Sequence, residues 1–139
     1  GHWYQKLTKK ELTGYHLALN PFLFLFFHLP FVWMSTWSWQ AELETLAVFA
    51  FFTTFWDFLW FVLNPHYSLH KFGPKQVWWH KHWLGKFPVD YYVSIGATVA
   101  FFTPLIIADP LASLLKLFTL IFGIIILTIM TILLYPKSY

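Results

Sequence analysis

Residues 110–135 read PLASLLKLFTLIFGIIILTIMTILLY, and Lys116 is the one charged residue in this run. A helix rises about 1.5 Å per residue, so the run is long enough to cross the hydrocarbon core of a bilayer, which is about 30 Å thick. Asp109 and Pro110 mark its start, because Asp is a good N-cap residue and Pro is tolerated at the first helical position. We therefore predict that residues 110–135 span a membrane.

Three more apolar segments are predicted to be spans of the same kind. Asn20-Pro21 marks the start of the first, and Pro88 with Asp90 marks the start of the third. The predicted spans are residues 21–37, with an extension backwards through residues 15–16, residues 39–63 and residues 88–108. Four such segments leave no soluble part large enough to bury them.

The composition of the whole chain agrees with a membrane protein. Of the 139 residues, 58% are hydrophobic and 24% are aromatic, whereas 11% are charged; soluble domains carry about 25% charged residues. The absence of Cys excludes a disulfide scaffold and a Cys-based zinc module. We expect an all-α fold, a polytopic membrane helical bundle that forms one domain over residues 1–139. It has four transmembrane helices and a cytoplasmic loop rich in His and Trp.

Lysine placement orients the predicted bundle. Cytoplasmic loops are enriched in Lys and Arg, and the turns at residues 38–44 and 109–110 contain neither. We therefore expect an integral protein of the cytoplasmic membrane, with both termini and the 64–87 loop on the cytoplasmic side. The lysines on that side are Lys6, Lys9, Lys10, Lys71, Lys75, Lys81, Lys86 and Lys137. Lys116 is expected to snorkel outward from the fourth span.

Asp57 is the clearest polar residue inside a predicted span. Thr53, Thr54, Trp60 and Asn64 lie on the same helical face, and this stripe is expected to point toward protein. Asp57 has two interpretations. It is either a structural carboxylate that fixes helix packing, or a metal ligand, proton carrier or catalytic acid, since burial favours a protonated carboxyl group.

His28 lies deep in the first span, two residues before Pro30, which frees a backbone carbonyl and is expected to kink the helix. The imidazole either satisfies loose backbone groups or serves with His16 as a candidate ligand for haem or a pigment. Glu42 and Glu44 lie in the first turns of the second span, where acids suit the helix dipole, and we assign them no chemistry.

Four histidines lie between the second and third spans. His66 and His70 are four residues apart, and on a short helix starting at Asn64 they would share one face, a spacing that can hold a metal. His80 and His82 would point the same way in an extended segment. These four are the candidate ligands for a transition metal such as Fe or Zn. The alternatives are membrane anchoring by contact with lipid headgroups, and contact with haem or a pigment.

The His66-x-x-x-His70 box resembles the boxes of membrane fatty-acid desaturases and hydroxylases. That resemblance implies a di-metal centre, usually iron, that oxidises lipid chains, although the paired His-His of the family's later boxes is absent here. Residues 56–65, WDFLWFVLNP, followed by Trp78-Trp79-His80, resemble a group of small uncharacterised bacterial and archaeal integral-membrane proteins. This second resemblance implies the same membrane fold and an upstream helix, but no activity.

Four short-looped spans without a large extramembrane region favour a non-catalytic component or accessory subunit of a membrane complex. Its expected partners are the lipid bilayer and other membrane proteins or further copies of itself. Nucleic acid is not expected, because the basic residues are scattered and include no Arg. The alternative is a His-box, metal-dependent membrane enzyme acting on a lipid-like substrate, with Asp57 moving a proton.

Overall fold

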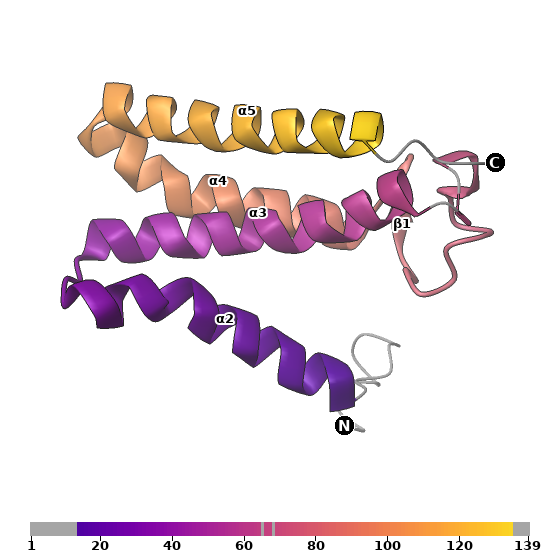
Figure 1. The fold of residues 1–139 in the computed structure, drawn as a ribbon, viewed down its shortest axis with the longest axis horizontal. Coiled ribbons are helices and arrows are strands. Elements are labelled where there is room, and N and C mark those ends of the chain that lie inside the picture. Colours follow the sequence, from indigo (N-terminus) through magenta and orange to yellow (C-terminus); the bar gives the residue numbers. More distant parts are fainter. Residues whose placement is uncertain (1–13, 65, 68, 135–139) are drawn as a thin grey trace.

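Four long helices make up most of the protein (Figure 1). The computed structural model describes residues 14–64, 66–67 and 69–134, without the side chains of residues 15 and 16. The helices are α2 (Gly14–Met34), α3 (Trp39–Leu63), α4 (Val89–Ala108) and α5 (Pro110–Leu134). Each is long and apolar enough to cross a membrane. The predicted all-α, four-span membrane bundle is therefore confirmed.

Three of the four predicted helix starts are correct. The Ser38 hydroxyl accepts a hydrogen bond from the Ala41 N–H (3.1 Å) at the start of α3. Asp109 accepts one from the Ala112 N–H (3.1 Å) at the start of α5. Pro88 occupies the N-cap position of α4 and supplies no side-chain hydrogen bond there. These caps use donors that the first helical turn cannot pair by itself.

The first span includes the predicted extension through residues 15–16, but its predicted start at Pro21 and its predicted end at residue 37 are wrong. α2 begins at Gly14 and continues through both Pro21 and Pro30, so Asn20-Pro21 does not start a helix. In an apolar environment the backbone has no water to bond, so a helix is favoured even where Pro removes one hydrogen bond. α2 ends at Met34 rather than residue 37, because Ser35 adopts a left-handed conformation with φ of 48°.

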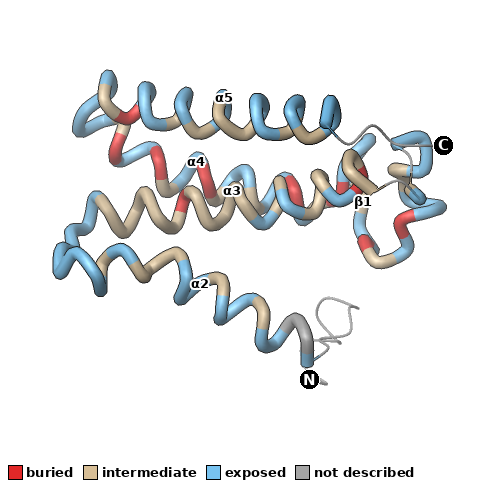
Figure 2. Tube along the Cα trace, viewed as in Figure 1, coloured by how far each residue is buried: buried red, intermediate tan, exposed pale blue. Residues whose placement is uncertain are grey.

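The central pair of the bundle is α3 and α4. Figure 2 shows buried positions where these helices meet, whereas α2 and α5 are mostly exposed or intermediate. Ala47 on α3 and Phe102 and Leu105 on α4 form a buried cluster. The small side chain of Ala47 leaves its carbonyl accessible to the Thr98 hydroxyl, which donates to it across the helix interface (3.4 Å).

Two acids of α3 connect it to the outer helices at the end opposite the α3–α4 connection. Glu42 accepts from Trp37 Nε1 (3.0 Å), and its other oxygen lies 3.1 Å from Nε2 of His28 on α2. Glu44 forms an ion pair with Lys116 of α5. Lys116 is thus paired with α3, where snorkelling alone was predicted. The two acids have a structural role here.

Replacing Glu42 with alanine should loosen α2. The change leaves His28 Nε2 and Trp37 Nε1 without this acceptor, at a cost of about 1–2 kcal/mol. We expect the distance distribution between spin labels on α2 and α3 to broaden in double electron–electron resonance spectra. Glu44→Ala is the control, because its ion pair reaches α5. Equal broadening in both variants would refute the role assigned to Glu42.

Candidate functional site

In the segment between α3 and α4, residues 64–88, the described residues form a folded cap on one end of the bundle (Figure 1). It contains a 3₁₀ turn (Leu69–Lys71) and a small hairpin of β1 (Trp83–Leu84) and β2 (Phe87–Pro88). The hairpin is connected to α4 by hydrogen bonds from the Val89 N–H to the His82 carbonyl and from the Tyr92 hydroxyl to the Leu84 carbonyl, both 2.9 Å. The cap is therefore continuous with the start of α4.

Aromatic side chains fill the space between the cap and α3. Phe61, near the end of α3, is fully buried and its ring centroid lies 4.8 Å from that of Phe72. Trp79 stacks parallel to Phe61 at 5.9 Å, and Trp83 meets Phe72 at 5.4 Å. Such rings bury large apolar areas and prefer these offset and edge-to-face arrangements. This aromatic cluster holds the cap against the helices.

His80 is the polar centre of the cap. Its Nε2 lies 2.9 Å from Asp57 Oδ2 on α3, and its Nδ1 lies 3.1 Å from Asp90 Oδ2 on α4. Asp57 Oδ2 also accepts a hydrogen bond from the Tyr91 hydroxyl (2.6 Å). We call Asp57, His80, Asp90 and Tyr91 the node. It joins α3, the cap and α4 at one point.

The node keeps His80 in one orientation. His80 is 8% exposed. Trp83 Nε1 donates a hydrogen bond to the backbone carbonyl of His80 (2.9 Å), and the backbone N–H of His80 donates to the Val77 carbonyl. A carboxylate only accepts hydrogen bonds, and a neutral imidazole carries one N–H. The contacts of His80 with Asp57 and Asp90 can therefore both be hydrogen bonds in two cases. Either the imidazole carries a proton on each nitrogen, or one of the two carboxyl groups is protonated and donates to the imidazole.

Exposure increases from the centre of the node outward. The side chain of Asp57 is 34% exposed and that of Asp90 is 54% exposed. Asp57 lies six residues before the end of α3, about 9 Å along the helix. The node thus reaches from the cap into the end of the span, where pairing lowers the cost of placing a carboxyl group.

No family model, curated protein or solved structure matches this chain.

The side chains of the four loop histidines do not come together at one site. His80 lies in the node, whereas His66, His70 and His82 are exposed. None of the described residues between 64 and 70 lies in the short α-helix considered for His66 and His70. Asn64 instead accepts from the His66 N–H (2.9 Å) through its side chain, and residues 69–71 form the 3₁₀ turn. Within the described ranges, no three His, Asp or Glu side chains form a group that could hold a metal ion.

The candidate residues of the spans have mixed outcomes. Asp57 faces protein, as predicted, but Thr53 and Trp60 of the same stripe are exposed. Both ring nitrogens of His28 contact protein atoms, since Nδ1 lies 2.6 Å from the Phe24 carbonyl and Nε2 contacts Glu42. His16 lies on α2, but its side chain is outside the described part of the chain.

Sequence reasoning missed Asp90 and Tyr91 as members of the node. From the sequence, Asp90 is used only to mark the start of the third span. Both lie in the first turn of α4, at the end of the bundle where α3 stops. In consecutive antiparallel spans, polar residues near the end of one helix lie at the same depth as those at the start of the next. That correspondence is the sequence signal that links them to Asp57.

Proposed function

We propose that this protein is a non-catalytic integral-membrane component, an accessory subunit of a membrane complex, whose cap is fixed by the Asp57–His80–Asp90 node. One observation carries the proposal: both ring nitrogens of His80 are engaged by carboxyl groups of the same chain. An imidazole bound in this way has no free nitrogen for a metal or a substrate. Its chemistry is used to hold the cap on α3 and α4.

The cap side is proposed to face the cytoplasm. Lys71, Lys75, Lys81 and Lys86 all belong to the cap, and the start of α2 and the end of α5 lie at the same end of the bundle (Figure 1). Among the described residues, the opposite end carries one lysine, Lys116, which is paired with Glu44. This asymmetry supports the orientation given by the positive-inside rule in a cytoplasmic membrane.

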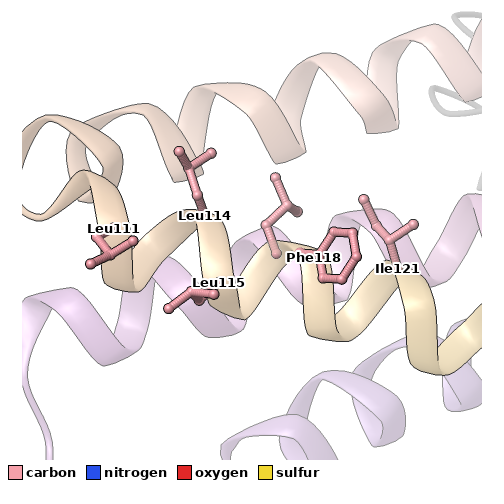
Figure 3. A pocket seen from close by; sticks show the side chains of 6 residues that line it. Leu111, Leu114, Leu115, Phe118 and Ile121 are labelled. Carbon is pink, nitrogen blue, oxygen red and sulfur yellow. The ribbon is translucent and has the colours of Figure 1, made fainter.

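The outer helices offer the surfaces for a membrane partner. Six apolar side chains along the first half of α5 line a shallow groove (Figure 3). They are Leu111, Leu114, Leu115, Leu117, Phe118 and Ile121. No described side chain of α2 is buried. Lipid chains or apolar helices fit such faces, and a second membrane protein or another copy of this chain is the proposed occupant.

Mild extraction followed by native mass measurement tests the accessory role. We expect a complex heavier than one chain and less than one iron or zinc per ten chains by elemental analysis. A lone monomer would contradict the accessory role. Stoichiometric iron or zinc that is lost in a His66→Ala, His82→Ala double variant would instead support the metal-dependent enzyme. Both substituted residues are exposed, so the double variant should fold normally.

A further inference from the structure

A hollow in the cap lies on the side of the hairpin. It has a volume of about 510 Å³ and runs between α3, the 69–74 segment and the turn of the hairpin. Phe58 of α3, Phe72 and Phe87 form its floor, with ring centroids of Phe58 and Phe87 at 5.8 and 6.1 Å from that of Phe72. Leu69 lines one side and is 49% exposed. The floor is thus apolar and aromatic.

The hollow also carries a positive charge that forms no ion pair within the described part of the chain. Lys86 lines the hollow, and the two-residue turn Gly85-Lys86 of the hairpin places it next to Phe87. Gly85 has a φ of 61°, which suits the first position of such a turn and which a residue with a Cβ rarely adopts. The turn therefore sets where the backbone of Lys86 lies beside the hollow.

The cap has no acid of its own to neutralise its lysines. Residues 64–88 contain four Lys and no Asp or Glu. The nearest acids along the chain, Asp57 and Asp90, contact His80. Lys71 and Lys81 lie over the rings of Tyr67 and Trp78, whereas Lys86 forms no ion pair with any described residue. The hollow therefore presents a cation that a ligand can neutralise.

We propose that this hollow binds one anionic phospholipid of the bilayer, with an acyl chain on Phe58, Phe72 and Phe87 and the phosphate at Lys86. The ligand must combine an apolar chain with a negative group, because the hollow combines an apolar floor with a cation. Phe58 lies five residues before the end of α3, about 7.5 Å inside the span. The hollow thus extends from chain depth to headgroup depth, as a phospholipid does.

Leu69, Phe87 and Leu84 give the cap an exposed apolar surface beside the hollow, with exposed fractions of 49%, 42% and 61%. Such side chains at an interface lie among the lipids, which places the open side of the hollow within reach of a phospholipid entering from the bilayer. This site does not depend on the accessory role, since it requires no protein partner.

Native mass spectrometry of the full chain tests the site. The protein is released from neutral detergent containing equal amounts of phosphatidylglycerol and phosphatidylcholine with the same acyl chains. We expect wild type to retain phosphatidylglycerol preferentially. Lys86→Gln should lower the ratio of the two bound lipids about fivefold, the effect of one Lys near an anionic lipid surface. Lys86→Arg should preserve the ratio.

Lys81→Gln is the matched control, because Lys81 belongs to the same cap but lies over Trp78. It should leave the ratio unchanged. Leu69→Gln should reduce retention of both lipids, because it makes the wall of the hollow polar. The proposal is overturned if wild type retains both lipids equally, or if Lys81→Gln lowers the ratio as much as Lys86→Gln. The latter result would indicate general attraction to a basic cap without a specific site.

Discussion

Phe61→Ala is expected to lower the free energy of unfolding by about 3–5 kcal/mol, the range found when a fully buried Phe is truncated. Phe61 is 0% exposed and its ring contacts those of Phe72 and Trp79. The cavity left behind would lie between the end of α3 and the cap, in the buried part of the aromatic cluster. Thermal unfolding in mild detergent, followed by tryptophan fluorescence, measures this loss.

Phe26→Ala provides the comparison, because Phe26 is 57% exposed on α2. Lipid or detergent replaces the lost contacts of such a side chain, so we expect a change within about 1 kcal/mol. The difference between the two variants separates a packed interior from a lipid-facing surface. Equal destabilisation would mean that the aromatic cluster does not hold the cap against the helices.

The four spans could be predicted because each helix carries its own signals. Long apolar runs identify them, and Ser38 and Asp109 cap their helices through hydrogen bonds to residues three positions later. The start of α2 could not be located in this way. Asn20-Pro21 has the sequence of a helix start, but the apolar environment favours continuing the helix through Pro21. A local signal was overridden by the environment.

The node could be predicted only in part, because its members are far apart in the sequence. Asp57 was identified since a carboxyl group is expensive in an apolar run. Helical periodicity gives the face on which Asp57 lies but not its partner, which is 23 residues away. His80 and His82 both lie in the segment WWHKHW, and nothing in the sequence distinguishes which of them would be buried. The fold of the cap buries one of them and leaves the other exposed.

The hairpin in the cap was not predicted at all. Its strands contain two residues each, which is too short for an alternating pattern to be recognised. Gly85-Lys86 between them does fit a two-residue turn with Gly first. The hairpin matters for function because it closes one side of the hollow that we assign to a phospholipid and leads directly into Asp90 and Tyr91. The loop is therefore a structured part of the candidate site.

His80→Ala should lower the free energy of unfolding by about 3 kcal/mol, because it removes two hydrogen bonds to carboxyl groups and leaves those groups without a shared partner. The loss should appear first in the cap. Hydrogen–deuterium exchange in residues 72–88 should increase, while exchange in the middle of α3 and α4 changes little. His82→Ala is the matched control, since His82 is exposed and its backbone carbonyl still accepts from Val89. We expect that variant to stay within about 0.5 kcal/mol of wild type.

A double-mutant cycle distinguishes a coupled node from separate contributions of its residues. If His80 and Asp57 act through their 2.9 Å contact, the variant with both changed to alanine should be less destabilised than the sum of the single variants, by about 1–2 kcal/mol. Additive effects would mean that each side chain stabilises the cap independently. The two variants would give a different result if His80 and His82 were metal ligands. In that case His80→Ala would remove bound metal and His82→Ala would weaken its binding, whereas the node requires His82→Ala to have no effect on the cap.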